Sequence, residues 1–592
     1  MKGMIFINRE EIIKHRKALF EKEKVFDKDK GLISSGVVKA HAYHTKLIGQ
    51  EVHGTRDSLG YAVGLLYGED EEYTKRAIEI IEKMLKLQDT DPESRTFGLW
   101  PYYAEEPLDE MDAPDWNWAD FLGKQLLEIL YVHKNKIPDE LITDIESACG
   151  YACESVIRRN EGVQYTNVVF MECLLLIATG ETLKNKRYFD YGIDKLERFL
   201  GFYKFHGAVF EYNSPCYTPL ITRDVGTFLK LVKDERAKKM AEMVNDICWK
   251  MIAEHFRYDM MQLAGPHSRA YTDMLSDDVL YGIELACEGE VSFDFEKKDD
   301  IETFWTKPYC PPKYRKYFRG EVLPKSTEKL IMRGFNYPYF AFAQTATTYH
   351  DERFTLGTFN REELWNQRRP LLGYIKGEHS PYCVRVRCLH DGYDFSSAVL
   401  HCVQKEGNVL GNINFSRDRG DTHIGLDLVK DTTIEAEDLR IIFEVVGDTE
   451  KINYKVNDES VEINIGNVPV KITHICTHFG DYPITHTTEK TDEYFRYSIV
   501  LYSGEKKKIN FGAMEKVISA FFIEMGKISK SSKIKAEFDG DYLKTVWETG
   551  GDSLELHTLK SVHPFKVNMY EDKQYINGEE LFTYLDSIEI QK

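Results

Sequence analysis

The spacing of apolar residues changes once along this 592-residue chain, and that change limits the folds it can adopt. From about residue 9 to about residue 290, apolar side chains recur every three or four positions, as in amphipathic helices. After about residue 325 they alternate with polar side chains, as in half-buried strands. Few helical stretches interrupt the second half, so its strands are expected to pair antiparallel. The sequence therefore predicts helices first and sheets second.

The helical half is too rich in helices for a four-helix bundle, and an incomplete (α/α) toroid of helical hairpins accounts for it better. Helices are expected at 10–24, 56–66, 72–87, 118–133, 139–159, 165–179, 184–202, 225–233, 236–255 and 277–286. Strands of an antiparallel β-sandwich are expected to include 339–345, 383–388, 424–428, 461–465 and 497–501. The predicted fold class is thus multidomain, an incomplete (α/α) toroid followed by an antiparallel β-sandwich.

The same change of period sets the predicted domain boundaries. Residues 1–305 form the helical catalytic domain, and 306–325 form a linker marked by Pro308, Pro311 and Pro312. Residues 326–530 form the β-sandwich, and 531–592 form a small C-terminal β region.

Charge and cysteine content limit the cellular compartment and the classes of binding partner to be expected. A net charge of −20 and a pI near 5.5 argue against nucleic acid or an anionic membrane as the main partner. Eleven cysteines without paired short spacing are typical of reduced thiols. No apolar stretch has the length of a secretory leader or a transmembrane helix. A cytoplasmic location is expected.

Two loops gather polar side chains beside glycine and proline, at the ends of predicted helices. One runs from Phe205 to Pro219 and contains Glu211, Asn213 and Tyr217; the other, 264–273, reads Ala-Gly-Pro-His-Ser-Arg-Ala-Tyr-Thr-Asp. Glycine and proline interrupt helices, so these side chains are expected on connecting loops, where active sites are commonly built. Two polar solvent-facing loops are the alternative explanation.

Domain order and the residue types of these loops resemble the polysaccharide lyases of the heparinase II/III, alginate and chondroitin/hyaluronate type. The resemblance covers most of the chain in domain order and is loose at the level of motifs. It implies that Asn167 neutralises a uronate carboxylate, and that Tyr217, His267 and Tyr271 act in proton transfer with assistance from Arg269. An N-terminal cap is the alternative role for Asn167 or Thr166.

The chemistry of β-elimination explains these residue types. The proton next to a carboxylate becomes removable only when donors stabilise the charge that builds on the carboxylate. A tyrosine base also needs a cationic neighbour to lower its pKa from about 10. Arg269 or His267 could supply that charge, and Glu211 could orient His267 or bind sugar hydroxyls.

Other stretches are expected to bind the acidic oligosaccharide substrate. His53 and Arg56 lie at the start of a predicted helix, and tryptophans 100 and 116 offer flat faces to sugar rings, with packing between helices as the alternative. The remaining predicted substrate-binding residues are Glu211, Asn213, Trp365, Gln367 and Arg368. The resemblance implies that the loop holding Trp365 to Arg368 closes one side of the cleft; an ordinary surface loop is the alternative.

No cofactor is expected, since phosphate-binding loops, Gly-x-Ser-x-Gly elbows and Cys-x-x-Cys pairs do not occur. A structural divalent metal in the β half is a candidate only, with side chains that no spacing singles out. His474, Cys476 and His478 alternate along one strand and span too far for one tetrahedral zinc. The other candidate ligands are His350, Asp351, His390 and His401.

Two other functions remain open at this stage. A glycoside hydrolase on the same helical scaffold would use paired carboxylates, with Glu211, Asp112, Asp115 and Asp224 as candidates. A non-catalytic carbohydrate-binding protein would bind without turnover. Product analysis separates the three, because only a lyase makes an unsaturated uronate that absorbs ultraviolet light.

Overall fold

The computed structural model describes residues 9–39, 44–68, 70–206, 208–295, 301–334, 341–362, 367–417, 429, 431–457, 459–565 and 567. The chain divides into two compact units. The first unit comprises Met1–Phe202, Tyr217–Trp249 and Asp277–Pro311. The second unit comprises Tyr203–Cys216, Lys250–Ser276 and Pro312–Lys592. Helix dominates the described part of the first unit, and antiparallel strand dominates that of the second.

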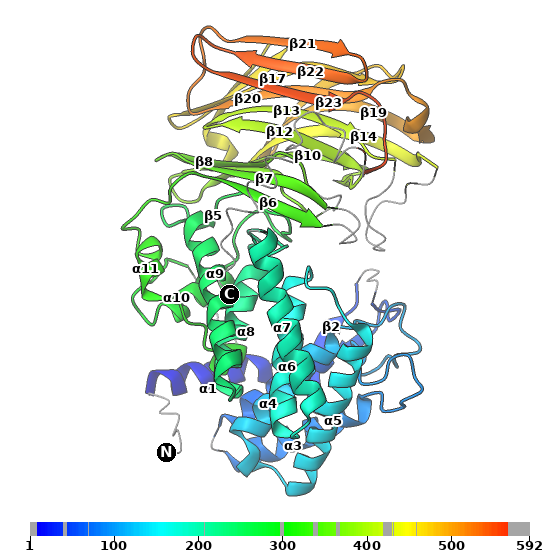
Figure 1. Ribbon diagram of the computed structural model, residues 1–592, viewed down its shortest axis with the longest axis vertical. Helices are drawn as coiled ribbons and strands as arrows, with labels where there is room; N and C mark the ends of the chain where they lie inside the picture. The colour runs from blue at the N-terminus through cyan, green and yellow to red at the C-terminus, as the bar shows by residue number, and fades with distance from the viewer. Residues whose placement is uncertain are drawn as a thin grey trace. The chain divides into compact units, whose positions relative to one another are not determined.

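Most of the helices lie in the first unit, where they form an inner and an outer layer, and the C-terminal ends of α7 and α9 belong to the second unit (Figure 1). Their bounds are α1 Arg9–Glu23, α2 Thr55–Leu66, α3 Glu71–Leu87, α4 Trp118–Val132, α5 Asp139–Arg159, α6 Thr166–Thr182, α7 Lys186–His206, α8 Tyr217–Leu231, α9 Glu235–His255 and α10 Asp277–Ala286. Helices α2, α4, α6 and α8 contact one another in that order, and α3 and α5 pack outside them. This is the alternation of inner and outer helices that an (α/α) toroid requires.

The amino-acid pattern explains which helices lie inside. Helices α4 and α6 are buried along almost their whole length, whereas α3 buries only Ala77, Ile80, Ile81 and Met84. A helix that is apolar all round must be enclosed, while a helix with one apolar stripe can face water.

One stripe of the inner helix α4 is charged. Asp120, Lys124 and Glu128 lie four residues apart, so they share one face. Lys124 Nζ lies 2.7 Å from Asp224 on α8, and Lys230 Nζ lies 2.6 Å from Glu128. Buried charges need such partners, and these pairs join α4 to α8 in the middle of the first unit.

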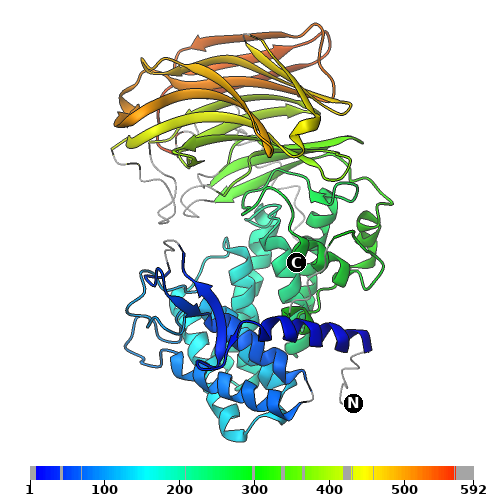
Figure 2. The ribbon, with the colours of Figure 1, turned by 180° about the vertical axis from the view of Figure 1, so that it is seen from behind.

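Short strands also occur in the helical half, where the sequence predicted none. Strands β1 (Phe26–Asp27), β2 (Leu32–Val37) and β3 (Glu51–His53) form one small antiparallel sheet beside α1, both dark blue in Figure 2. Strands β4 (Phe256–Arg257) and β5 (Gln262–Leu263) form a hairpin that belongs to the second unit. Their few residues are too short a window for a period of two to emerge.

Within its described residues, the second unit contains three stacked antiparallel sheets. The nine-stranded sheet has the order β18-β19-β14-β10-β9-β8-β7-β6, with β11 beside β10; the six-stranded sheet has the order β12-β13-β20-β17-β16-β15; the third sheet is β21-β22-β23. Their bounds are β6 Thr327–Gly334, β7 Ala341–His350, β8 Phe354–Phe359, β9 Leu371–Ile375, β10 Tyr382–His390, β11 Tyr393–Asp394, β12 Ala398–Lys405, β13 Asn408–Phe415, β14 Thr433–Val446, β15 Ile452–Val456, β16 Ser460–Ile465, β17 Val468–Phe479, β18 Thr485–Lys490, β19 Tyr494–Asn510, β20 Val517–Met525, β21 Lys533–Asp539, β22 Tyr542–Glu548 and β23 Ser553–Leu559.

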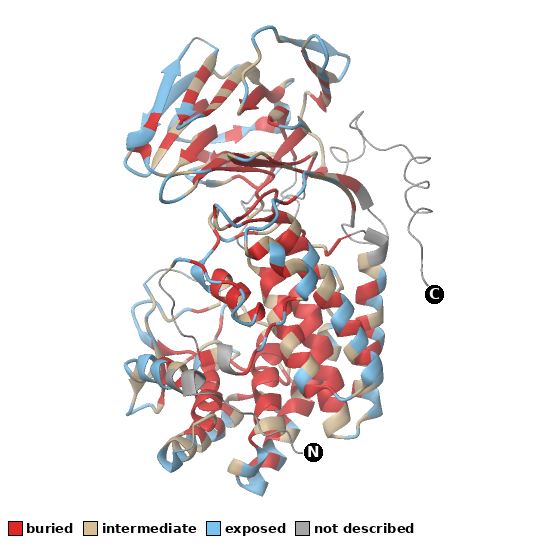
Figure 3. Ribbon diagram, turned by 90° about the vertical axis from the view of Figure 1, so that its left-hand side faces the viewer, coloured by how far each residue is buried: buried red, intermediate tan, exposed pale blue. Residues whose placement is uncertain are grey.

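Alternating apolar residues fill the spaces between these sheets. Ile441, Phe443 and Val445 of β14 belong to one core with Phe521 and Ile523 of β20. A smaller core of Leu410, Phe522, Trp547, Leu554 and Leu556 joins the six-stranded sheet to the third sheet. Figure 3 shows buried residues along the facing strands and exposed residues at many turns.

The predicted linker at 306–325 is corrected by the structure. It contains helix α11, Pro312–Phe318, and the division between the units falls after Pro311. Proline in the first turn does not break a helix, since the first N–H groups have no intrahelical partner. The division also places 203–216 and 250–276 with the sheets, unlike the predicted single boundary at residue 305.

The predicted start of α8 is also wrong, because Pro219 suggested that the preceding loop continues. The sequence predicted a helix from residue 225, but α8 begins at Tyr217 and includes Pro219 in its first turn. The predicted strands at 383–388, 461–465 and 497–501 are confirmed within β10, β16 and β19. Residues 339–340 and the predicted strand 424–428 lie outside the described residues. None of the described helices combines the length and apolar character needed to cross a bilayer.

Candidate functional site

The first unit contains a cavity of about 460 Å³ with a charged and aromatic lining. Its cations are Lys22, Arg56 and Arg223, its carboxylates are Asp57 and Glu302, and its aromatic rings are Tyr102, Tyr103 and Trp118. Arg56 is the second residue of α2, and Trp118 is the first of α4. Residues at the N-terminal ends of two inner helices therefore line the cavity.

The charges of this cavity favour an acidic ligand. Arg56 lies 3.7 Å from Glu302 and 3.9 Å above the ring of Phe121. Although burial raises it, the pKa of Glu302 is lowered overall by nearby cations, Arg56 first among them, so this carboxylate is ionised. Lys22 lies 3.7 Å from Asp57. Three cations against two carboxylates leave the lining with a positive excess in a chain of net charge −20.

The aromatic residues form one packed wall of the cavity. The rings of Tyr102 and Trp118 stack with centroids 4.3 Å apart, and Tyr103 meets Tyr102 edge-on at 4.8 Å. The indole N–H of Trp118 donates a 2.9 Å hydrogen bond to Thr55, which fixes the ring at the start of α2. Burial raises the pKa of Tyr102 to about 12, so its hydroxyl stays protonated.

Three residues predicted to bind substrate in this unit have other roles or positions. Trp100 is 1% exposed and donates to the carbonyl of Met84, so it is a core residue and not a platform for sugars. His53 is buried, with its two ring nitrogens 2.6 Å from Glu105 and 3.2 Å from Asp27. Trp116 is partly buried against the helical core. Arg56 alone among the predicted substrate-binding residues of this unit lines the cavity.

Asn167 lies in the first turn of α6 and is 3% exposed. The N-cap residue is Tyr165, without a side-chain capping bond, so the alternative that Asn167 or Thr166 caps the helix is wrong. Within the described part of the chain, the Asn167 amide oxygen has no hydrogen-bond partner. A buried polar group left unsatisfied costs about 1–3 kcal/mol, and such a group calls for an explanation.

Tyr217 is also on the first unit, as the first residue of α8, and it is largely buried. The other predicted proton-transfer residues, His267 and Tyr271, belong to the second unit together with Glu211. Convergence of these residues with Asn167 on one pocket remains a prediction.

The loop 264–273 is fastened to the nine-stranded sheet of the second unit. His267 and Arg369 exchange backbone hydrogen bonds of 3.1 and 2.7 Å, and the Ala270 N–H donates to the Gln367 carbonyl at 2.8 Å. Arg269 Nε donates to the Gln367 side chain at 3.1 Å. Gln367 therefore positions Arg269 from the neighbouring segment.

A buried ion-pair chain holds the end of this loop. Asp273 pairs with both Arg369 and Arg385. Arg385 continues to Glu444, whose other oxygen lies 2.5 Å from Arg496 Nη2. The chain crosses β10, β14 and β19, so the loop that carries Arg269 and Tyr271 ends on a fixed point of the sheet.

The side chains around His267 differ from the expectation. Asn213 donates to the carbonyls of Ala264 and Pro266 at 2.8 and 3.0 Å, so its amide supports the loop instead of binding substrate. Glu211 is 4% exposed and lies 3.8 Å from Arg269 rather than against His267. Tyr271 is 59% exposed.

His267 itself cannot supply a positive charge. It is 1% exposed, and burial, with a smaller contribution from His255, lowers its pKa to about 3. The imidazole is therefore neutral near pH 7, which corrects its expected role as a cation beside a tyrosine. Arg269 is left as the cation of this loop.

This pKa gives a prediction about stability. The unfolded state protonates His267 near pH 6.5, and the folded state does so only near pH 3. Between these values the unfolded state binds more protons, so stability should fall as the pH falls through this window. At about pH 5 the loss amounts to about 2 kcal/mol for this group.

Urea unfolding at about pH 7.5 and about pH 5 should show this loss of stability, and His267→Gln should make the free energy of unfolding depend less on pH. An unchanged slope in the variant would contradict it.

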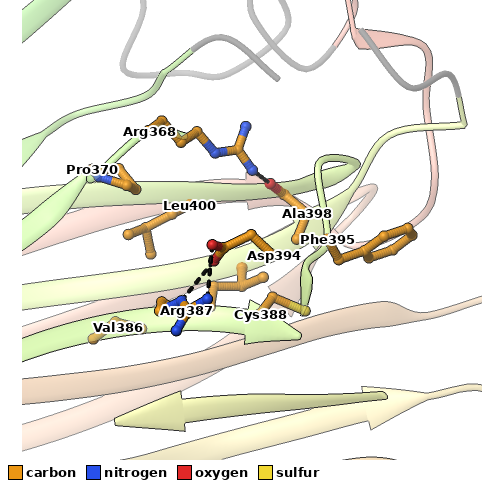
Figure 4. A pocket seen from close by; sticks show the side chains of 10 residues that line it. Arg368, Pro370, Val386, Arg387, Cys388, Asp394, Phe395, Ala398 and Leu400 are labelled. Carbon is orange, nitrogen blue, oxygen red and sulfur yellow. Dashed lines mark hydrogen bonds and ion pairs between the residues drawn. The ribbon is translucent and has the colours of Figure 1, made fainter. Parts of the chain in front are cut away.

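Arg368 lines a small cavity of about 30 Å³ between the sheets (Figure 4). Its guanidinium donates to the Ala398 carbonyl, and burial lowers its pKa to about 10, which leaves it charged. Nearby, Arg387 holds Asp394 through bonds of 2.8 and 2.9 Å. The space suits a water molecule rather than a sugar, so the predicted substrate-binding role of Arg368 finds no cavity of sugar size here. Trp365 lies outside the described residues.

The candidate metal ligands do not form a metal site within the described ranges, where no three His, Cys, Asp or Glu side chains cluster suitably. His474 instead hydrogen-bonds Thr477 at 2.9 Å, and the strand carries a register irregularity between His474 and Cys476. Of the carboxylates of the hydrolase alternative, Asp112 lies 3.6 Å from Lys46, Asp115 lies 3.6 Å from His44 and Glu211 lies 3.8 Å from Arg269. Asp224 is fully buried against Lys124.

Among the charged residues of the first cavity, sequence reasoning missed Lys22, Arg223 and Glu302. They come from α1, α8 and a short 3₁₀ turn, 280 positions apart at the extremes (302 − 22). Each stands alone among ordinary helix residues in the sequence. The local signal for this cavity is the cluster of aromatic residues between 100 and 118, three of which line it.

Comparisons with known proteins give a family model that matches part of the chain and solved structures of low sequence identity. Residues 18–286 match a family model described as a domain of unknown function (DUF8769). The curated proteins contain no match to this chain. A crystal structure of heparinase III is 10% identical over 94% of this chain and 92% of that chain, with a TM-score of 0.49. A heparinase III with methylated lysines is 11% identical over 94% and 91%, with a TM-score of 0.37.

A structure of a heparan sulfate lyase HepC mutant from Pedobacter heparinus is 8% identical over 86% of this chain and 82% of that chain, with a TM-score of 0.35. These identities and TM-scores say nothing about side-chain roles. Roles in this chain depend on its own geometry.

Proposed function

We propose that this protein is a lyase that cleaves a uronate-containing oligosaccharide by β-elimination. The observation that carries the proposal is Asn167, a 3% exposed asparagine whose amide oxygen has no hydrogen-bond partner among the described residues. No described hydrogen bond engages its amide nitrogen either. The amide oxygen is an acceptor, so a sugar hydroxyl that donates to it would complete its bonding.

Asn167 fits the electrostatic demand of the reaction. Removal of the proton next to the uronate carboxylate transfers charge onto that carboxylate. The amide N–H groups of Asn167 would donate to it, and in a site shielded from water such donors stabilise the developing charge strongly.

Two tyrosines are the candidates for proton transfer. Tyr271 is two positions from Arg269, a cation that would stabilise negative charge in the transition state. Tyr217 shares the first unit with Asn167 and starts an inner helix. We assign the base to one of them and leave the choice to mutagenesis; His267 acts at most as a neutral hydrogen-bonding group.

The cavity of the first unit would bind the acidic oligosaccharide. Its positive excess attracts the uronate, and the Tyr102–Trp118 wall offers apolar ring faces. Arg56 would contact a carboxylate directly, since guanidinium and carboxylate bind in a bidentate fashion.

Product analysis tests the proposal. Purified protein incubated with a panel of uronate oligosaccharides should generate an unsaturated product that absorbs ultraviolet light, and no incorporation of ¹⁸O from labelled water should accompany it. Incorporation without absorbance identifies a hydrolase instead. In that case Glu211→Gln should abolish turnover while His267→Ala spares it. Binding without any product identifies a carbohydrate-binding protein.

A further inference from the structure

We propose a second saccharide site on the second unit, for an acidic sugar residue held away from the residues discussed above. A cavity of about 520 Å³ lies where the six-stranded sheet, the third sheet and the β7–β8 turn meet. Its volume falls in the usual range for small-molecule sites. The choice of an acidic sugar rests on the proposed function, but the site itself does not.

The floor of this cavity depends on two glycines. A Cβ at Gly526 would lie 2.3 Å from the ring of Phe354, and one at Gly407 would lie 2.2 Å from the Met525 carbonyl. Gly526 also has φ +85°, a conformation that other residues rarely adopt. The backbone thus comes close to Phe354, whose ring meets that of Tyr349 at 5.8 Å. The floor is aromatic and closely packed.

The walls are fixed before any ligand binds. The Gly526 N–H donates to the Pro469 carbonyl at 2.8 Å, and the Ser529 N–H donates to the buried Glu524 carboxylate at 2.8 Å. On the opposite side, Arg353 is held by Asp351 through a 2.9 Å ion pair. A site with preformed walls loses little entropy on binding.

The charges around this cavity favour an anionic ligand. Asp351 pairs with Arg353, and Asp552 pairs with Lys405. Lys527 and Lys530 also line the cavity, yet neither forms an ion pair with any residue that the structure describes. Glu406 is the one further carboxylate among the described lining residues. Outside the ion pairs, the described lining therefore has two ammonium groups and one carboxylate, and this excess of one positive charge favours a ligand with a single negative charge.

Trp547 makes the second, independent observation. It lines the cavity and is 2% exposed, with its ring stacked on Phe522 at 5.0 Å. Its indole N–H has no acceptor among the described residues. Buried donors are almost always paired, and this N–H is itself closed to solvent, so it meets a sugar oxygen in the cavity when the ring shifts on binding. Apolar ring faces, a single anion and a spare N–H donor together describe a uronate rather than a phosphate or a lipid.

Fluorescence titration with a monosaccharide tests this site, because glucuronate has no glycosidic bond to cleave. Full-length protein should bind glucuronate more tightly than glucose, with a change in tryptophan emission that Trp547→Phe removes. The double variant Lys527→Gln/Lys530→Gln should weaken this binding about ten- to a hundredfold. Both lysines are exposed, so the variant should fold normally.

A matched control carries the same charge change elsewhere on the unit. Lys506→Gln/Lys508→Gln, on exposed positions of β19, should leave the emission change and the affinity intact. Equal binding of glucose and glucuronate, or equal weakening by both double variants, would overturn the proposal. Asn167→Ala separates the two functions, since it should slow product formation about 10²–10³-fold and keep the Trp547 response. A lost response in Asn167→Ala would place the bound sugar in the other site.

Discussion

Replacing Asn167 with alanine is expected to lower kcat/KM for a uronate oligosaccharide about 10²–10³-fold, the usual effect of removing one donor to a developing anion. The melting temperature should stay the same or rise. The Asn167 amide oxygen has no hydrogen-bond partner in the described part of the fold, so the folded protein loses no bond from it and is relieved of a desolvation cost of about 1–3 kcal/mol. Initial rates from ultraviolet absorbance and a thermal melt measure the two effects.

Asn245 supplies the control for this experiment. It is also a buried asparagine of the first unit, but its amide donates to the Tyr309 carbonyl at 2.9 Å. Asn245→Ala should therefore destabilise the protein by about 1–3 kcal/mol and leave kcat/KM unchanged. If Asn167→Ala behaves in the same way as Asn245→Ala, Asn167 is a structural residue and the proposed role is lost.

The second large effect concerns the tyrosines. One of Tyr217→Phe and Tyr271→Phe should lower kcat about 10²–10⁴-fold, because general acid–base groups contribute that much, and the other should have a mild effect. Tyr271 is 59% exposed, so its replacement should change stability by no more than about 0.5 kcal/mol. Steady-state rates at several pH values identify the base, since its loss removes the acidic limb of the pH profile.

Arg269→Gln distinguishes the two outcomes further. If Tyr271 is the base, loss of the cation two positions away should lower kcat, because that charge would stabilise the transition state. If Tyr217 is the base, the effect of Arg269→Gln on kcat should be smaller. Mild effects from both tyrosine variants would exclude a tyrosine base altogether.

Local pattern was enough to predict most elements of the fold. Helix α5 occupies the predicted residues 139–159, and β10, β16 and β19 contain their predicted strands, since each has many apolar residues at one clear period. The errors fall where one residue type is compatible with two kinds of local structure. Pro219 and Pro312 lie in the first turns of α8 and α11, where proline is compatible with a helix, although both suggested a loop.

The candidate site was only partly predictable. Asn167 and Arg56 could be singled out because each polar residue stands at the start of an apolar helical segment. Trp100 and Trp118 look equivalent in the sequence, yet Trp100 is in the core and Trp118 lines the cavity. Packing decides between them, because the same indole can fill a core or bound a cavity.

The sequence by itself determined the order of helix and sheet and the alternation within each, because periods of 3.6 and 2 are properties of neighbouring residues. Tertiary structure alone decided which charged groups lie together and which polar groups are buried. It brought Lys22, Arg223 and Glu302 to one cavity, buried His267 until its pKa fell to about 3, and left the Asn167 oxygen without a partner among the described residues. Burial and pairing depend on segments far apart in the chain, so no local pattern records them.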